Sequence, residues 1–279
     1  IDGRRSLVSG LFPQGPKQVF RVTFSDGRST ECCAEHLWRV HYRSWPQPRI
    51  LNTDQVALLL TKKRYRHRLW IDMPSGVFGH AEQLPLDPWL LGALLGDGKL
   101  SGSSIVFSTA ATEMLSRMQE RIGEDFMLRA AGGYDYRIVQ NAGHQRAGVQ
   151  GVTPNTIKDA LCALGLWNIT SDAKFIPPIY LNAPRAARLD LLRGLIDTDG
   201  WVECWGSIRF CTTSERLARD VVALVRSLGG WCTVRNRQPT YSYKGERRIG
   251  KPAFVCNIHH NDPSSLALLS EKCARIVKR

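Results

Sequence analysis

The chain has 279 residues, 43% of them apolar, enough to bury a sizeable core in one large domain or two to three smaller ones. Its formal net charge of +13 favours a polyanionic partner such as nucleic acid. No apolar run approaches the roughly 18 residues of a membrane helix, and no basic-then-apolar leader is found, so we expect no membrane partner and a cytoplasmic location.

Residues 1–45 are predicted to be rich in β-strands. Gln18–Phe24 alternates apolar and polar residues and is followed by Ser25–Gly27, a typical hairpin turn. Ser29–Cys33 is expected to form the returning strand, and Ala34–Val40 follows it.

Residues 46–86 are predicted to be a basic connector. Asn52 starts a capping sequence before a short helix, Gln55–Leu60. Lys62–Arg68 then carries five cationic side chains in seven residues. Such a run is often only a solvated face, but for a protein that binds nucleic acid Lys62, Lys63 and Arg64 form a candidate phosphate-binding arm.

Two apolar segments predict the centre of the fold. Leu90–Gly98 follows Asp87-Pro88, a helix start signal, and Leu192–Gly200 follows a similar signal at Pro184. Each segment predicts a helix that stops at a glycine, Gly98 or Gly200.

Small residues recur four apart in both helices, at Gly92 and Gly96 and at Gly194 and Thr198. Residues four apart share one helix face, so the two helices can pack backbone to backbone. Asp97 and Asp199 would then meet at the carboxyl ends of the helices, where partial negative charge favours a divalent cation.

The sequence after each motif repeats in register. Asp97 and Asp199 are 102 residues apart, and Ile-x-Phe-x-Thr follows at Ile105 and Ile208. A helix–strand–helix unit that recurs at constant spacing indicates an internal repeat. The elements expected in the first half are strands within 99–109 and 126–140, a helix over 112–122 and a helix from Pro154 to Leu164 capped by Thr153. Those expected in the second half are a helix over 214–228, a long hairpin over 232–258 and a closing helix over 264–277.

The second motif, Leu-Arg-Gly-Leu-Ile-Asp-Thr-Asp-Gly, and the related first motif resemble the two-repeat LAGLIDADG homing endonucleases of inteins. The resemblance implies an α+β fold of two pseudo-symmetric αββαββα repeats, 87–181 and 182–279, which form a DNA-binding β-saddle around a two-helix interface. A small β-rich segment precedes them. The first motif has Leu95 where the second has Asp197, so Asp197 is not expected to bind metal.

The resemblance also implies the chemistry. Asp97 and Asp199, with Gly98 and Gly200 beside them, would hold two or three divalent ions, Mg²⁺ in the first place with Ca²⁺ or Mn²⁺ as substitutes. Lys174, in Lys-Phe-Ile-Pro, matches a lysine block of the family. Lys174 lies 77 residues after Asp97, and in the second half Lys272 and Lys278 lie 73 and 79 residues after Asp199. Of the two, Lys272 better resembles the pattern of the family.

Strands that follow each motif would read DNA in the major groove. The candidates in the first half are Lys99, Ser101, Ser103, Arg129, Arg137 and Gln140. Those in the second half are Trp201, Glu203, Trp205, Arg209, Arg235, Asn236, Arg237, Gln238, Tyr241, Tyr243, Lys244, Arg247, Arg248 and Lys251.

The first 45 residues resemble part of an intein splicing domain, in which His36 takes the position of a splicing histidine and Cys33 that of the preceding threonine. His260-Asn261 resembles a terminal splicing pair, but Asp262-Pro263 follows it, so it is interpreted as strand and turn. The chain as given is not expected to splice itself.

The sequence therefore predicts a monomeric, metal-dependent DNA endonuclease that breaks both strands of a duplex target of roughly 20 base pairs. Two alternatives remain open. One is an inactive DNA-binding or maturase-like protein of the same fold, and the other is a protein-splicing element.

Overall fold

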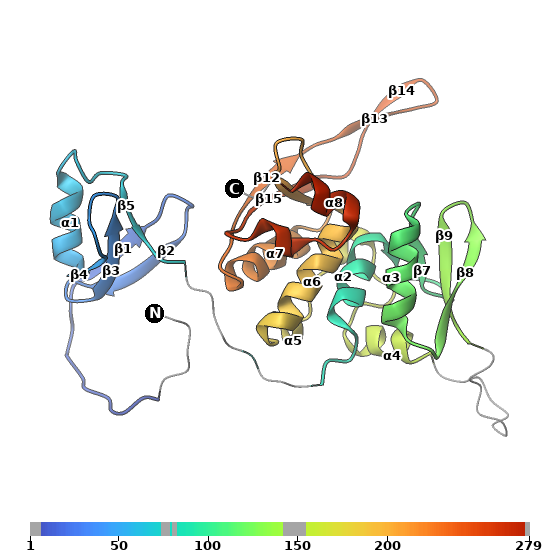
Figure 1. The fold of residues 1–279 in the computed structure, drawn as a ribbon, viewed down its shortest axis with the longest axis horizontal. Helices are drawn as coiled ribbons and strands as arrows, with labels where there is room; N and C mark the ends of the chain where they lie inside the picture. Colours follow the sequence, from blue (N-terminus) through green and yellow to red (C-terminus); the bar gives the residue numbers. More distant parts are fainter. Residues whose placement is uncertain (1–6, 74–78, 80–82, 142–154, 277–279) are drawn as a thin grey trace. The chain divides into compact units, whose positions relative to one another are not determined.

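The computed structural model describes residues 7–73, 79, 83–141 and 155–276. Two compact units divide the chain, an N-terminal unit of Arg5–Pro74 and a second unit of Ser75–Arg279. We call the second the motif unit because it contains both motif segments. Figure 1 follows the chain through both units.

The N-terminal unit is rich in β-strands, as its alternating sequence predicts. Its elements are β1 (Val19–Thr23), β2 (Ser29–Cys33), β3 (Leu37–Tyr42), β4 (Arg49–Asn52), α1 (Thr53–Thr61) and β5 (Leu69–Ile71). β1 and β2 form the predicted hairpin, and β3 lies between β4 and β5 in an antiparallel sheet. Residues 49–71, within the predicted connector, thus supply two strands and a helix to this unit.

The short helix of this unit is fixed by its first residues. The Asn52 side chain accepts a hydrogen bond from the Gln55 amide at 2.8 Å, and the Gln55 side chain accepts one from the Asn52 amide at 2.9 Å. This reciprocal capping box satisfies two amides that a helix start otherwise leaves unpaired. The predicted helix is confirmed, and it begins two residues earlier, at Thr53.

In the motif unit the two motif helices, α2 and α6, lie side by side between two antiparallel sheets (Figure 1). The first half contains α2 (Pro88–Asp97), β6 (Gly98–Lys99), β7 (Val106–Ser108), α3 (Thr112–Ile122), β8 (Phe126–Gly132), β9 (Asp135–Gln140), α4 (Thr156–Ala163) and the short 3₁₀ turn η2 (Ser171–Ala173). The second half contains α5 (Pro178–Leu181), α6 (Arg185–Asp197), β10 (Gly200–Val202), β11 (Ile208–Thr212), α7 (Glu215–Ser227), β12 (Trp231–Arg237), β13 (Thr240–Tyr243), β14 (Glu246–Ile249), β15 (Ala253–His259), the 3₁₀ turn η3 (Pro263–Leu266) and α8 (Ser270–Arg275).

The two sheets have the same topology. Their strand orders are β6-β7-β9-β8 and β10-β11-β15-β12, so the equivalent strand of each half occupies the same place. β13 and β14 form a separate two-stranded ribbon inserted between β12 and β15. The predicted α+β fold of two repeats around a helix pair is confirmed within the described residues.

Burial explains why the first motif helix, α2, lacks a polar face. Residues Trp89 to Leu95 of α2 are all buried, because α6 covers one side of the helix and the first-half core the other. In contrast, α7 buries Leu217, Val221 and Leu224, a spacing of one helix face, and packs on β11, β12 and β15.

Three local predictions are wrong. The closing helix over 264–277 is instead η3 followed by α8, because the extended segment between them gives its amides to a side chain of α6. Asn155, not Thr153, caps α4, and Thr153 and Pro154 lie outside the described residues. Gly98 does not end α2 in the left-handed conformation. Its φ is −82°, and β6 begins there.

Candidate active site

The motif helices pack backbone to backbone where Gly92 meets Gly194. A Cβ atom on Gly92 would lie 2.2 Å from the Leu191 carbonyl oxygen, and one on Gly194 would lie 2.2 Å from the Trp89 carbonyl oxygen. Since no side chain fits at these distances, the close approach requires glycine at both positions. The contact that the spacing of small residues predicts is confirmed.

The helices also meet at their carboxyl ends. A Cβ atom on Gly96 would lie 2.0 Å from Oγ1 of Thr198 and 3.5 Å from the Asp199 amide nitrogen. Gly98 and Gly200 face the last turn of their own helices, where a Cβ atom would lie 2.3 Å from the Leu94 oxygen and 2.5 Å from the Ile196 oxygen, respectively. In each half the backbone therefore passes from helix to strand at a glycine that leaves no space for a side chain. Asp97 and Asp199 lie at adjoining helix ends.

The two carboxylates share an environment that disfavours their charge. Burial and, to a smaller extent, the neighbouring Asp97 together raise the pKa of Asp199 to about 6, against the opposing effect of Lys174 and Lys272, although the residue itself reaches solvent. Burial also raises the pKa of the half-buried Asp97. Two carboxylates held together in this way favour a bound cation, which neutralises both.

Lys174 is buried under the end of α2. Its Nζ donates to four backbone carbonyl oxygens, which belong to Leu94 at 3.3 Å, Leu95 at 2.9 Å, Gly96 at 2.9 Å and Gly98 at 2.8 Å. Burial lowers the pKa of Lys174 to about 8, while Asp199 and Asp97 act against the shift. The ammonium group thus caps the carboxyl end of the first motif helix.

Lys272 repeats this arrangement at the end of α6. Its Nζ donates to the carbonyl oxygens of Ile196 at 2.6 Å, Asp197 at 2.7 Å, Thr198 at 3.1 Å and Gly200 at 2.7 Å. Each acceptor lies 102 residues after its counterpart under Lys174, and burial lowers the pKa of Lys272 as well. Lys272 therefore occupies the equivalent place in the second half, whereas Lys278 lies outside the described residues.

Asp197 has a different environment from Asp199. It is buried, its Oδ2 accepts from the Trp89 indole at 2.9 Å, and its Oδ1 accepts from the amides of Leu268 at 2.9 Å and Leu269 at 3.1 Å. Three donors occupy this carboxylate, which links α2, α6 and the segment before α8. The sequence does not place Asp197 in the metal site, and these contacts give it a structural role.

The site offers few ligand atoms for a cation, and all of them are oxygen atoms. The described residues contain no group of three or more His, Cys, Asp and Glu side chains arranged to hold a metal. A cation here would rest on Asp97 and Asp199, with backbone carbonyl oxygens and water completing its shell. The carbonyl oxygens of Gly98 and Gly200 already accept from a lysine, and each retains a second lone pair.

Across the first sheet, three predicted DNA-binding residues lie in one row. Lys99 on β6 pairs with Val106, Val106 with Arg137, and Arg137 with Arg129. Lys99, Arg129 and Arg137 are exposed, while the adjacent Ile138 is buried. The row lies on the face of the sheet opposite the core. Of the remaining candidates, Ser101 and Ser103 lie in the β6–β7 loop and Gln140 lies on β9.

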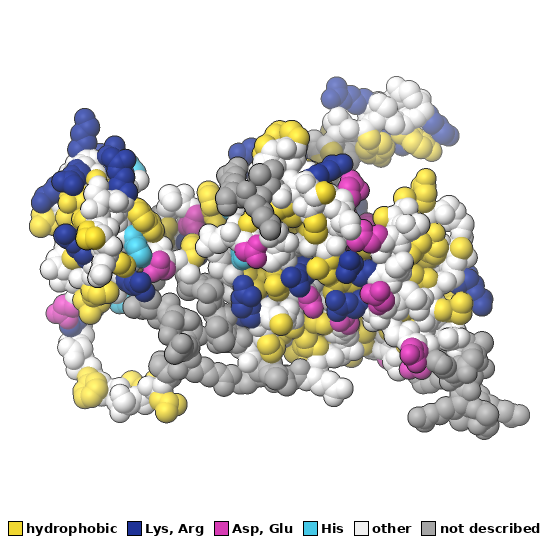
Figure 2. Space-filling model, in the orientation of Figure 1, with side chains coloured by type: hydrophobic (Ala, Val, Ile, Leu, Met, Phe, Trp, Pro, Cys, Tyr) yellow, Lys and Arg dark blue, Asp and Glu magenta, His cyan; other side chains and the backbone are white. Residues whose placement is uncertain are grey.

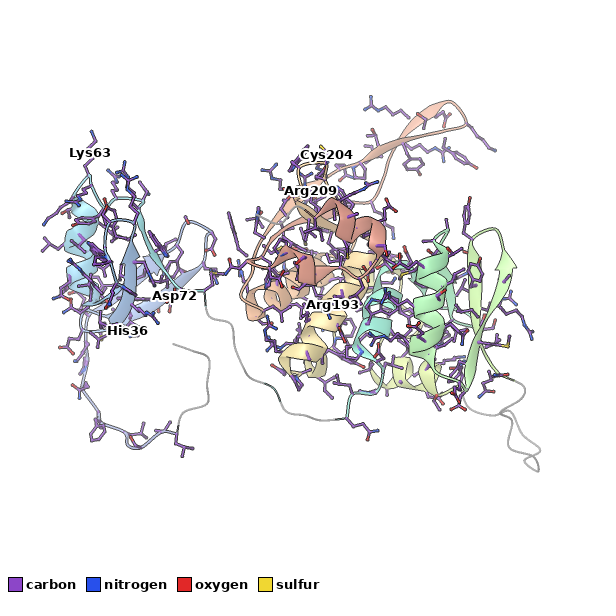
Figure 3. All side chains as sticks on the ribbon, in the orientation of Figure 1. His36, Lys63, Asp72, Arg193, Cys204 and Arg209 are labelled. Atoms are coloured by element: carbon purple, nitrogen blue, oxygen red, sulfur yellow. The ribbon has the colours of Figure 1, made fainter. Side chains whose placement is uncertain are left out.

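The equivalent row of the second sheet contains Trp201, Arg209, Asn257 and Thr233. Glu203 pairs with Arg209 at 2.8 Å and accepts from the Trp201 indole at 3.0 Å, so it orients these two side chains. The Arg209 guanidinium lies 6.0 Å from the centroid of the Trp205 ring, and Cys204, the residue before Trp205, is exposed; Figure 3 labels Arg209 and Cys204. Sequence reasoning missed Asn257 and Thr233, which the period of two along β12 and β15 could have indicated.

The β13–β14 ribbon carries the densest group of predicted residues. All of its strand residues are exposed, and cationic side chains gather over it in Figure 2. Arg248 lies over the Tyr243 ring with its guanidinium 4.8 Å from the ring centroid. The other candidates in this region are Arg235, Asn236 and Arg237 on β12, Gln238 after it, Trp205 in the β10–β11 loop, Tyr241 on β13, Lys244 in the ribbon turn, Arg247 on β14 and Lys251, which pairs with Asp172 at 3.0 Å.

In the N-terminal unit the predicted arm is the turn that follows α1. Lys62, Lys63 and Arg64 are exposed, and Arg64 lies over the Tyr42 and Tyr65 rings. His36 is exposed, and its ring lies 4.7 Å from that of Trp38 in an edge arrangement. Figure 3 shows His36 and Lys63 at opposite ends of this unit.

Comparison with known families finds a match in the second half. Residues 186–251 match the family described as LAGLIDADG-like domain. This range covers nearly all of α6 and the elements from β10 to β14.

Curated relatives match most of this chain with a fraction of their own length. The replicative DNA helicase DnaB of Mycobacterium intracellulare is 29% identical over 245 residues, 80% of this chain and 36% of that protein. The RecA protein of Mycobacterium tuberculosis is 29% identical over 284 aligned residues, 96% of this chain and 33% of that protein. The chain spans about a third of the length of both relatives.

Solved structures give a similar but weaker comparison. A mesophilic variant of the homing endonuclease I-DmoI is 12% identical with a TM-score of 0.41, and the match covers 68% of this chain and 95% of that one. A variant of I-DmoI in complex with its target DNA and magnesium is 11% identical with a TM-score of 0.39, and the match covers 65% of this chain and 92% of that one. Within the described residues no helix is long and apolar enough to cross a membrane.

Proposed function

We propose that the chain is a site-specific DNA endonuclease that breaks both strands of its target by metal-dependent hydrolysis. The observation that carries the proposal is the paired centre. Asp97 and Asp199 lie at adjoining helix ends, and beneath each end a lysine donates to four carbonyl oxygens at equivalent positions. A duplex has two strands related by a twofold axis, so a pseudo-twofold pair of acidic groups matches its symmetry.

The residues present fit a divalent cation. Carboxylate and carbonyl oxygens are the donors that Mg²⁺ prefers, and the raised pKa of Asp199 reflects a charge that a cation would neutralise. When bound, such ions would polarise the scissile phosphate and activate the attacking water. Asp97 and Asp199 would hold the ions, and Lys174 and Lys272 would add positive charge beside them; Ca²⁺ or Mn²⁺ would substitute for Mg²⁺ in binding.

DNA binding is proposed for the outward faces of the two sheets and for the ribbon. The rows of Lys99, Arg137 and Arg129 and of Trp201 and Arg209 present cationic and aromatic groups on strands, and a two-stranded ribbon fits the major groove. One chain supplies both halves, so we propose a monomer on a duplex of about 20 base pairs. Lys62, Lys63 and Arg64 would contact phosphates outside this core.

An intein origin is part of the proposal. A segment similar to this chain occurs in two proteins of different names, a DnaB helicase and a RecA protein, and takes up about a third of each. A segment that recurs within different proteins supports an inserted element. Within this proposal the N-terminal unit is part of a splicing domain, and His36 is its splicing-like residue.

Cleavage of a plasmid library tests the endonuclease proposal. Supercoiled plasmids that carry randomised sites of about 20 base pairs are incubated with the chain and magnesium, and linear products are sequenced. We expect linear DNA with a common site, and a loss of at least about 100-fold in rate for Asp97→Asn or Asp199→Asn.

The same assay separates the alternatives. An inactive binding or maturase-like protein would bind the plasmid without cutting it, so no linear DNA would form with or without magnesium. Wild-type rates in both asparagine variants would refute the assignment of the two aspartates. Magnesium-independent cleavage would refute the role of the metal.

A further inference from the structure

The lysine beneath each motif helix lies in a segment that a helix of the other half holds in place. Lys174 belongs to the first half by sequence, but its backbone carbonyl accepts from the hydroxyl of Ser214, at the start of α7, at 2.6 Å. Two residues on, the Ile176 amide donates to Asp220 of α7 at 2.9 Å. Ser214 is fully buried, so this hydrogen bond is shielded from water.

The second lysine is held from the opposite direction. Glu113 of α3 accepts from the backbone amide of Ser270 at 3.0 Å and from its hydroxyl at 3.1 Å. Arg117, one turn later on α3, donates to the Leu268 carbonyl at 3.2 Å. The segment that leads to Lys272 is therefore tied to the first half, and the Ser270 amide holds the pKa of Glu113 below its usual value.

The helix that carries Lys272 depends on these contacts. α8 has only six residues, and its N-cap residue Leu269 makes no side-chain cap hydrogen bond. Its first amides are instead satisfied from outside, by Asp197 at Leu269 and by Glu113 at Ser270. Isolated helices of this length are unstable in water, so the position of Lys272 follows from these two acceptors.

The bracing residues are not copies of one another. Counted from the N-cap residues, Ala111 and Ser214, the residue equivalent to Glu113 in the second half is Arg216. Glu215 beside it is exposed and pairs with Arg219 on its own helix. Asp220 is equivalent to Arg117, and the buried Met118 to the buried Val221. The two halves thus use different residues of equivalent helices to hold the lysine segment of the other half.

We propose that Glu113 and Asp220 are positioning residues which fix Lys272 and Lys174, respectively, across the boundary between the halves. Neither half then holds its own lysine in position without the other half. If the chain is an endonuclease, as proposed above, the cut made by each half depends on a helix of the other half. The bracing itself is a property of the chain and does not depend on that function.

Lysine labelling of the full chain tests the bracing without DNA. Trace acetic anhydride is added to the unmodified chain and to Glu113→Ala, Asp220→Ala and Glu215→Ala, and acetylation of each lysine is measured by peptide mass spectrometry. We expect Glu113→Ala to speed labelling of Lys272 about fivefold without changing Lys174, and Asp220→Ala to do the reverse. Glu215→Ala should change neither, and Glu113→Gln, which keeps an acceptor, should restore most of the protection.

Equal changes at both lysines, or no change beyond that of Glu215→Ala, would overturn the proposal. If Glu113→Ala does not fold, Arg117→Met removes the second hydrogen bond of the same brace and carries the same expectation. Strand-resolved cleavage of an end-labelled target from the plasmid library gives a second measurement. Glu113→Ala and Asp220→Ala should slow opposite strands by about tenfold, whereas a general loss of structure would slow both strands alike. A chain that cuts no library plasmid refutes the endonuclease, and the labelling result still decides the bracing.

Discussion

The carboxylate of Asp199 is held at an energetic cost. Its pKa is raised to about 6 from an ordinary value near 3.8, so folding disfavours its charged form. An aspartate of this kind lowers stability where it is ionised, which is above pH 6, and the penalty disappears below the unfolded pKa. A loss of stability of this kind is typical of residues that bind a ligand and do not stabilise the fold.

Asp199→Asn should therefore stabilise the chain when no metal is bound. We expect Tm to rise by about 2–4 °C at pH 7, a value reduced for the solvent that reaches the residue, and the difference to vanish near pH 4. Thermal unfolding in the presence of a chelator, followed by circular dichroism at several pH values, measures it. A destabilised variant at pH 7 would contradict this account of the site.

Asp197, two residues away, predicts the opposite result. It is buried and accepts from the Trp89 indole and from the amides of Leu268 and Leu269. Asp197→Ala leaves three buried donors unpaired and should lower the free energy of unfolding by about 3 kcal/mol. Urea unfolding gives this value, and the exposed Arg219→Ala should change it by less than about 0.5 kcal/mol. A mild effect at Asp197 would show that its contacts contribute little.

At the scale of elements, the packing of α2 on α6 depends on the absence of a side chain. A Cβ atom on Gly92 would lie 2.2 Å from the Leu191 oxygen, and backbone cannot move aside as a flexible side chain can. Gly92→Ala should force the helices apart, lower stability by about 3 kcal/mol and slow cleavage more than binding, because the two aspartates separate. Urea unfolding and cleavage rates at saturating protein measure both effects, and a variant with unchanged rates would refute the need for the contact.

The helix pair could be predicted from sequence because its signals are local. Gly92 and Gly194 stand at helical spacing within apolar runs, and the repeat places Asp97 and Asp199 in register. The acceptors of Lys174 and Lys272 could not be predicted, since they lie 72 to 80 residues away along the chain and are backbone atoms with no sequence signal.

The interruption of the closing helix could not be predicted for the same reason. Nothing within residues 264–277 indicates that Asp197 and Glu113 take the amides of Leu269 and Ser270. Local helix propensity loses to these distant acceptors, and the segment between η3 and α8 becomes extended. The contact of Glu113 with Ser270 is also one of the proposed braces between the halves. The contacts that make the helix prediction wrong are therefore the ones on which the further inference rests.

At the scale of the whole molecule, positive charge is concentrated away from the paired carboxylates. Residues 89–200 carry as many acidic as basic side chains, whereas residues 201–279 carry 14 basic against 6 acidic. A polyanion would thus be attracted to the flanking strands, and the centre would remain available for cations. The β13–β14 ribbon is the most exposed part of this basic surface, and it forms a sheet of its own.

Replacement of Thr240–Ile249 by a two-residue turn should separate DNA binding from folding. β12 and β15 pair with each other independently of the ribbon, so the unfolding midpoint should stay unchanged. The variant loses Lys244, Arg247 and Arg248, and because each phosphate contact releases about one counterion, the slope of log binding constant against log salt should fall in magnitude by about 2 to 3. Fluorescence anisotropy with the selected duplex at four salt concentrations measures the slope. An unchanged slope would show that the ribbon does not contact phosphates, and would leave the outward rows of the two sheets as the DNA-binding surface.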